Sequence, residues 1–234
     1  MGTGPVAVLF DKDGTLFHFE ASWAAWAAEL VAELAAGRPE TAAALCDAIG
    51  FDPAARRFDP ASPVIAATPD EIATLMLPHL PGRSFADLVA LMNRRAADAP
   101  MVEAVPLDPL LSGLRAVGLG VGLATNDAEG SARRHLDRAG VLSAFDFVAG
   151  CDSGFGAKPE PGMLLAFAER LSVVPARVVM VGDSPHDLEA GRAAGMICVG
   201  VLTGPGGAEP LAPFADAVLP DIGHLPGWLG LSQV

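Results

Sequence analysis

The residues of this chain best suited to chemistry are four aspartates at or just beyond the ends of two apolar runs. Asp11 and Asp13 stand two residues apart in FDKDGTLF, and Asp183 and Asp187 stand four apart in VVMVGDSPHD. Two acids after a buried strand, such as the second pair, suit a hard divalent cation with oxygen ligands. Structural interpretations compete with this one, because Asp and Gly form turns and Asp-Ser-Pro can start a helix.

Two further stretches offer groups that could hold an anion. Thr125 and Asn126 end the apolar run of GVGLATND, where a hydroxyl, an amide and backbone N–H groups can face one phosphate. The same two residues are also typical of a helix N-cap. Lys158, in AKPEP, is one of only two lysines, the other being Lys12; it is either a phosphate partner or a solvated surface residue.

The composition indicates a folded, acidic protein. The chain has 234 residues, of which 51% are hydrophobic and 18% charged, so we expect a sizeable packed core. The formal net charge of −13 argues against nucleic acid or an anionic membrane surface as a partner. An acidic protein that binds an anion needs local positive charge at its site.

Cysteine usage and hydropathy favour a reducing cytoplasm. Cys46, Cys151 and Cys198 are widely separated and have no CxxC spacing, so we expect neither a disulfide framework nor a zinc site. No apolar run reaches the roughly 18 residues of a membrane span. The first residues lack the basic region and cleavage site of a signal peptide. We expect a cytoplasmic monomer or homodimer.

Short Val-rich runs alternate with helical patterns, which predicts an α/β fold with a mostly parallel, Rossmann-like sheet. Such sheets bind ligands beyond the carboxyl ends of their strands. The predicted strands are 6–10, 121–125, 145–150, 178–182 and 197–202. The predicted helices between them are 108–118, 131–140, 161–172 and 187–195.

A helical insert interrupts the first crossover of this predicted sheet. Residues 21–36 are strongly helical, with Trp23, Trp26, Leu30 and Leu34 near helical spacing. Further helices are predicted at 39–49, 69–77 and 84–97. We therefore expect a core domain formed by residues 1–17 and 102–234, with a helical cap domain, residues 18–101, inserted after the first strand.

The order DxDGT, TN, KP and GDSPHD resembles the haloacid dehalogenase-like hydrolase superfamily, and within it the phosphoglycolate phosphatase-like branch. AGRAAGM, GVLTG and the tail from ADAVLPDI to LPGWL add to the likeness. The resemblance covers essentially all of 5–20 and 102–229, and the insert matches in placement and helical character. It implies an Mg²⁺-dependent phosphatase that acts on a small phosphorylated metabolite through an aspartyl-phosphate.

The resemblance also implies roles for the two aspartates of the first stretch. Asp11 would be the nucleophile, since a carboxylate can attack phosphorus and divide hydrolysis into two steps. Asp13 would protonate the leaving oxygen and then activate water, which requires a raised pKa in the first step.

Charge then requires cations around the bound phosphate. Mg²⁺ would be held by the Asp11 carboxylate, the Asp13 backbone carbonyl and Asp183. Lys158 would neutralise the phosphate from the other side. The remaining phosphate oxygens would be held by Thr125 and Asn126. Asp187 is expected to orient Lys158 or a metal-bound water.

Relatives of the superfamily with other chemistry fit less well. Dehalogenases lack the second acid, which is present here as Asp13, and the Schiff-base phosphonatases need a lysine in the insert. No lysine lies between Lys12 and Lys158. A sugar phosphomutase remains an alternative, as does a non-enzymatic, receiver-like phosphate sensor.

The insert is expected to close over the site and exclude water. A carboxylate on the substrate, as in a phosphoglycolate-like monoester, would need a basic partner from the insert or its start. His18, Arg56 and Arg57 are the candidates for substrate specificity, against solvated helix faces as the alternative. His18 itself departs from the common pattern, since relatives often carry Asp there. Trp23 and Trp26 are expected in the core of the cap.

Overall fold

The computed structural model describes residues 4–231 and contains a six-stranded sheet in the order β5-β4-β1-β6-β7-β8. Every pair of neighbouring strands is parallel, as the Val-rich runs predict. The strands are β1 (Ala7–Phe10), β4 (Gly120–Ala124), β5 (Phe147–Ala149), β6 (Val178–Gly182), β7 (Ile197–Val201) and β8 (Ala217–Leu219).

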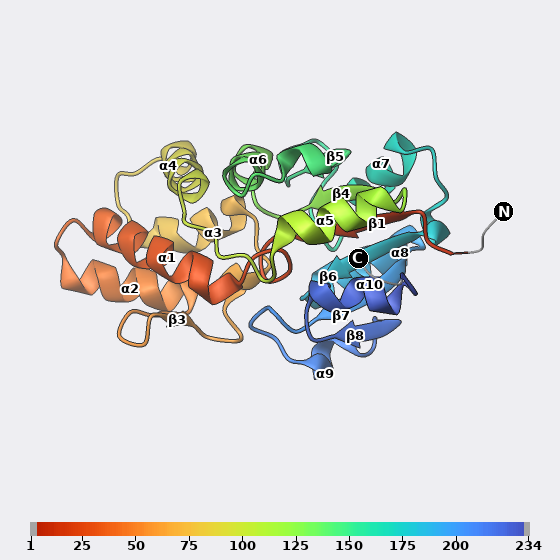
Figure 1. The fold of residues 1–234 in the computed structure, drawn as a ribbon. Helices are drawn as coiled ribbons and strands as arrows, with labels where there is room; N and C mark the ends of the chain where they lie inside the picture. Colours follow the sequence, from red (N-terminus) through yellow and green to blue (C-terminus); the bar gives the residue numbers. More distant parts are fainter. Residues whose placement is uncertain (1–3, 232–234) are drawn as a thin grey trace.

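Helices cover both faces of the sheet, and the alternation of side chains along β1 shows why (Figure 1). Val8 and Phe10 pack with α5 and α6, whereas Ala7 and Leu9 pack with α7 and α8 on the other face. The core helices are α5 (Leu107–Ala116), α6 (Glu129–Arg138), α7 (Gly162–Arg170), α8 (Pro185–Ala194), α9 (Ala208–Leu211) and α10 (Leu225–Trp228), with 3₁₀ turns η3 (Leu142–Ala144), η4 (Pro175–Arg177) and η5 (Ile222–His224).

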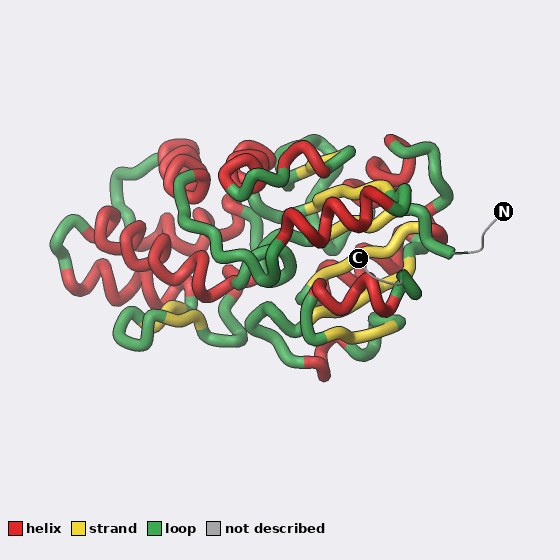
Figure 2. Tube along the Cα trace, in the orientation of Figure 1, coloured by secondary structure: helices red, strands yellow, loops and turns green. Residues whose placement is uncertain are grey.

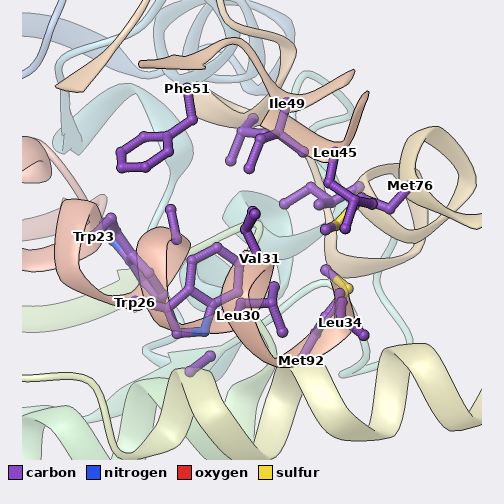
Figure 3. Packing of buried hydrophobic residues seen from close by; sticks show 14 of the residues in the cluster. Trp23, Trp26, Leu30, Val31, Leu34, Leu45, Ile49, Phe51, Met76 and Met92 are labelled. Atoms are coloured by element: carbon purple, nitrogen blue, oxygen red, sulfur yellow. The ribbon is translucent and has the colours of Figure 1, made fainter. Parts of the chain in front are cut away.

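A helical cap follows β1 and has a hydrophobic cluster of its own, formed by residues between 19 and 99. Trp23, Trp26, Leu30 and Leu34 line one side of its first helix and are buried in this cluster (Figure 3). The cap contains α1 (Phe19–Ala35), α2 (Pro39–Ile49), β2 (Phe51–Asp52), β3 (Arg57–Phe58), η1 (Pro63–Ile65), α3 (Pro69–Met76), η2 (Leu77–His79) and α4 (Phe85–Ala97). None of the helices within residues 4–231 has both the length and the apolar character required to cross a bilayer.

The cap lies beyond the carboxyl ends of the strands (Figures 1 and 2). Its two connections to the core run side by side, because His18 N–H donates to Val102 O and Ala104 N–H donates to Leu16 O. Helix α4 of the cap packs against α6 of the core.

The structure differs from the sequence predictions mainly at short elements. The antiparallel pair β2–β3 and the edge strand β8 were not predicted. Helix α8 begins at Pro185, two residues before the predicted start, because Ser184 is its N-cap and forms a capping box with Asp187.

Candidate active site

The FDKDGTLF stretch leaves β1 and folds into a closed loop. Lys12 O accepts hydrogen bonds from the N–H groups of Leu16 and Phe17, and Gly14 N–H donates to Phe17 O. Gly14 has a φ of 89°. A Cβ atom at this position would lie 2.3 Å from Asp183 Oδ2, so glycine permits the loop to approach that carboxylate.

Lys158 lies between two carboxylates at the centre of the site. Its Nζ is 2.5 Å from Asp11 Oδ1 and 2.6 Å from Asp187 Oδ1, and it donates to Ala124 O at 2.8 Å. The side chains of Lys158, Asp11 and Asp187 are 3%, 9% and 3% exposed, so this ion triad is almost fully withdrawn from solvent. Lys158 is therefore not a solvated surface residue.

The acidic residues fit a hard cation. One carboxylate oxygen each from Asp11, Asp183 and Asp187 lie within 4.8 Å of one another, and all three residues are buried. Asp187 is already engaged at both oxygens, by Lys158 and by the Ser184 N–H and hydroxyl groups. Asp11 and Asp183 are therefore the better placed carboxylate ligands, and Asp187 is better placed to orient Lys158.

Electrostatics in the metal-free cluster favour bound protons. Burial, together with Asp187 and Asp13, raises the pKa of Asp11 to about 7 despite the opposing charge of Lys158. Burial and the neighbouring Asp11 raise the pKa of Asp183 well above its ordinary value. Burial alone would lower the pKa of Lys158, but Asp11 and Asp187 raise it, so the ammonium stays charged.

We expect the metal-free protein to lose stability as pH rises from about 4 to about 7. In this window the folded chain holds protons on Asp11 and Asp183 that the unfolded chain has released, so the cluster lowers the free energy of unfolding as pH rises. The effect should be on the order of a few kcal/mol. The buried His135, whose pKa is lowered to about 4, makes a smaller contribution of opposite sign. Mg²⁺ binding at this cluster, which the resemblance implies, would have to displace these protons, so Mg²⁺ should stabilise the protein more at pH 8 than at pH 5.

Denaturant unfolding at several pH values, with EDTA or with Mg²⁺, measures both effects. The Asp183→Asn variant is the control, since it should show a shallower dependence on pH in EDTA. An equal pH dependence of the free energy of unfolding in wild type and in Asp183→Asn, both in EDTA, would contradict the assignment of protons to the cluster.

Asp13 lies beneath the cap and is held from two sides. Trp23 Nε1, from cap helix α1, donates to Asp13 Oδ1 at 2.8 Å, and Lys12 Nζ lies 3.2 Å from Asp13 Oδ2. Burial, together with the charge of Asp127, raises the pKa of Asp13 despite the opposing charge of Lys12 and the Trp23 hydrogen bond. Trp23 thus belongs both to the cap core, as predicted, and to the surroundings of the catalytic loop.

Lys12 belongs to a buried polar network beside Asp13. Its Nζ is fully buried, 2.5 Å from Asp127 Oδ2 and 3.0 Å from His135 Nδ1. Burial and the adjacent Lys12 lower the pKa of His135 to about 4, so the ring is neutral at pH 7. Its Nδ1 then accepts from Lys12, and its Nε2 donates to Ala96 O of the cap at 2.8 Å.

We expect Trp23→Phe to lower kcat by roughly 10- to 100-fold while leaving the fold intact. An aromatic ring is kept at this position, but the hydrogen bond to the largely buried carboxyl of Asp13, of about 1.5–3 kcal/mol, is lost. Steady-state kinetics on a simple phosphomonoester measures the loss. Trp228→Phe is the matched control, because Trp228 belongs to the core domain, far from Asp13 in the sequence, and is 37% exposed. Equal kcat values for the two variants would contradict a positioning role for Trp23.

Thr125 and Asn126 both line the cavity, and neither caps a helix, because α6 begins at Glu129 after Ala128. The hydroxyl of Thr125 accepts from Asp127 N–H at 3.1 Å. The Asn126 side chain accepts from Lys158 N–H at Oδ1 and donates from Nδ2 to Lys158 O. Its Nδ2 also donates to Ala66 O of the cap. A direct phosphate contact by the Asn126 side chain stays a prediction, and its contacts here position Lys158.

The structure does not bring the predicted specificity residues to the cavity. Arg56 and Arg57 are exposed in and beside the β2–β3 hairpin, and His18 is half-buried where the chain enters the cap. None of the three is among the described residues that line the cavity, whereas Asp11, Asp13 and Lys158 are. His186, to which the sequence assigns no role, lines it from the start of α8.

Sequence reasoning missed several residues around the catalytic loop. Thr15 donates to Asp183 Oδ1 at 3.2 Å, and Thr203 donates to Gly14 O at 2.5 Å. Asp127 was visible in ATND, directly after the predicted phosphate ligands, and could have been suspected. His135 lies within a predicted helix, and nothing in the sequence separates it from a surface histidine.

Curated relatives align with part of the chain. A phosphoglycolate phosphatase from Rhodospirillum rubrum is 38% identical over 125 residues, which are 53% of this chain and 52% of the relative. A phosphoglycolate phosphatase from Escherichia coli is 37% identical over 94 residues, 40% of this chain and 37% of the relative. The alignments thus span about half of these relatives or less.

Solved structures share the fold over nearly the whole chain. A protein described as a predicted phosphoglycolate phosphatase from Haemophilus somnus is 16% identical, with a TM-score of 0.74 and 97% of this chain and 99% of that chain covered. A β-phosphoglucomutase from Clostridium difficile is 20% identical, with a TM-score of 0.68 and 94% and 93% covered.

The family is shown by a match that covers most of the chain. Residues 6–195 match the sequence pattern of the haloacid dehalogenase-like hydrolases. This range contains the loop of Asp11 and Asp13, the whole cap, Lys158 and the Asp183 stretch. The chain therefore belongs to the haloacid dehalogenase-like hydrolase family.

Proposed function

We propose that the protein is an Mg²⁺-dependent phosphatase that hydrolyses a small phosphomonoester through an aspartyl-phosphate on Asp11. The observation that carries the proposal is the buried triad of Asp11, Lys158 and Asp187 beside Asp183, beneath a cap and at the carboxyl ends of the strands. A carboxylate nucleophile, a fixed cation and further oxygen ligands are together what phosphoryl transfer to an aspartate requires.

In the first step an oxygen of Asp11 forms a bond to phosphorus as the bond from phosphorus to the ester oxygen breaks. Asp13 gives its proton to the departing oxygen, and burial, which raises the pKa of Asp13, favours the protonated form that this step needs. In the second step Asp13 takes a proton from water. That water attacks the phosphorus, the bond from phosphorus to Asp11 breaks, and inorganic phosphate is released.

The other site residues hold the reactants in line. Lys158 offsets charge on Asp11 and on the transferring phosphoryl group, and Asp187 fixes its ammonium. Thr125 contributes a hydroxyl for a phosphate oxygen. Asp11, Asp183 and the Asp13 backbone would hold Mg²⁺, which supplies positive charge against the phosphate oxygens when bound. The cap excludes bulk water from the cavity.

The relatives make 2-phosphoglycolate the first natural substrate to examine. Two curated relatives are phosphoglycolate phosphatases. Sugar phosphomutation is the alternative within the family and differs in its product. A phosphatase releases inorganic phosphate, whereas a mutase returns an isomeric phosphate ester.

Release of inorganic phosphate from phenyl phosphate tests the proposal, because this ester makes few demands on the cap. We expect turnover with Mg²⁺, loss of turnover in EDTA and recovery when Mg²⁺ is restored. A lack of phosphate release from phenyl phosphate and from a broad panel of metabolite esters, with Mg²⁺ present, would contradict the proposal.

A further inference from the structure

The cavity has two unlike halves. The core side carries the charged groups, including Asp11, Asp183 and Lys158. The cap side is built from apolar side chains, among them Phe19, Val64, Ile72 and Met92. These four come from α1, η1, α3 and α4, respectively. The phosphoryl group belongs to the charged half, so the leaving alcohol must lie against the apolar half.

The basic residues of the cap lie elsewhere. The arginines at 38, 56, 57, 83, 94 and 95 and His79 are all exposed, and none lines the described cavity. The basic side chains that do line it belong to the core side. They are Lys158, already bound by two carboxylates, and His186, exposed at the start of α8.

A charged leaving group is therefore poorly matched to the cap. A carboxylate or a second phosphate placed against Ile72 and Met92 would lose its hydration without gaining a cation. An apolar leaving group has no charge to desolvate there, and the burial of its apolar surface is favourable.

Two uncharged polar atoms interrupt the apolar half. Trp26 Nε1 and Asn93 Oδ1 are buried and have no hydrogen-bond partner among the described residues, and both side chains line the cavity. Trp26 is 7% exposed and comes from α1, where it packs into the cap cluster (Figure 3). Asn93 comes from α4. Trp26 Nε1 lacks an acceptor and Asn93 Oδ1 lacks a donor, so a hydroxyl or an amide of the ligand that reached either atom would satisfy it.

We propose that the substrate is the phosphate ester of an uncharged, largely apolar alcohol that carries one further hydroxyl or amide group. The apolar body would rest on the cap residues around Ile72 and Met92. The polar group would pair with Trp26 Nε1 or with Asn93 Oδ1. This inference rests on the proposed phosphatase function and assigns the class of its leaving group.

The first experiment compares butyl phosphate with 2-phosphoglycolate in wild type and in variants that place a cation in the cap. We expect kcat/KM for butyl phosphate to exceed that for 2-phosphoglycolate by about tenfold or more. Ile72→Arg should move this ratio toward 2-phosphoglycolate by about tenfold. Leu75→Arg is the matched control, since Leu75 lies on the same helix α3 but is 37% exposed and outside the cavity lining.

A second variant that places a cation in the cap keeps the test valid if Ile72→Arg fails to fold. Ala67→Lys changes a half-buried loop residue that also lines the cavity, and thermal unfolding shows whether each variant keeps the wild-type transition. Preference for 2-phosphoglycolate in wild type would overturn the inference. So would equal shifts in the Leu75→Arg control and the two cavity variants.

The polar pair is tested with butyl phosphate and 4-hydroxybutyl phosphate. Wild type should prefer the hydroxylated ester, and the variant that removes the partner of the hydroxyl, Asn93→Leu or Trp26→Phe, should reduce that preference by about tenfold. An unchanged preference in both variants would contradict the assignment of these atoms.

Calorimetric binding of the same esters to Asp11→Asn protein separates this inference from the proposed function. Absence of turnover with every ester contradicts the phosphatase. The relative binding of butyl phosphate and 2-phosphoglycolate still decides the class of leaving group, and tighter binding of 2-phosphoglycolate overturns the inference.

Discussion

Asp11→Asn is expected to reduce phosphate release by about 10⁴-fold or more, an increase of about 5.5 kcal/mol in the activation free energy. The amide keeps the size of the carboxyl group but lacks the anionic oxygen that attacks phosphorus. It also removes one ligand oxygen from the cluster of Asp11, Asp183 and Asp187. The measurement is kcat for phenyl phosphate at saturating Mg²⁺.

The control for this variant is Asp137→Asn, which makes the same chemical change at an exposed position of α6. It should retain wild-type kcat. Purified Asp11→Asn protein that released phosphate within about tenfold of the wild-type rate would exclude Asp11 as nucleophile.

Lys158→Met is expected to lower the free energy of unfolding by about 3–5 kcal/mol in metal-free buffer. The substitution keeps the length of the side chain but leaves the buried carboxylates of Asp11 and Asp187 without their shared cation. We expect kcat to fall by about 10²–10³-fold as well, since a charge that stabilises the transition state is lost. Urea unfolding with EDTA and with Mg²⁺ measures the stability.

The second buried lysine provides a matched comparison. Lys12 is also fully buried between carboxylates, but its close partner Asp127 lies outside the candidate cation cluster. Lys12→Met should therefore destabilise the protein without rescue by Mg²⁺, whereas Mg²⁺ should restore part of the stability of Lys158→Met. Equal rescue of the two variants would show that the cation does not bind beside Asp11 and Asp187.

The sheet could be predicted because its central strands are buried on both faces and read as short Val-rich runs. VVMVG became β6 with the predicted bounds of 178 and 182, and PETAAALCDAI became α2 over 39–49. Strand β8 escaped because it is three half-buried residues at an edge, too short for a hydrophobic pattern to stand out. The β2–β3 pair has two residues in each strand and no pattern at all.

The grouping of the site residues followed from the same principle. Carboxyl ends of parallel strands meet at one edge of the sheet, so Asp11, Thr125 and Asp183 could be placed together before any contact was known. Lys158 follows β5 and reaches the same edge from a loop. Its contact with Asp187 was expected as one of two alternatives, whereas its ion pair with Asp11 required the tertiary structure.

The cap side of the site could not be predicted. Which face of α1 meets the core domain depends on how the cap helices pack. Trp23 could therefore be predicted as a residue of the cap's hydrophobic cluster, but its hydrogen bond to Asp13 could not be predicted. The network of Lys12, Asp127 and His135 joins residues more than a hundred positions apart. Arg56 and Arg57 were reasonable candidates by charge alone, but the hairpin presents them to solvent.

Trapping of a phosphoenzyme tests the central claim most directly. Wild-type protein is mixed with ³²P-labelled phenyl phosphate and Mg²⁺, quenched in acid within the first turnover and digested, and the labelled peptide is identified. The account predicts a hydroxylamine-sensitive label on the peptide that contains Asp11, absent from Asp11→Asn. Turnover without such a label, or a label on another residue, would contradict it.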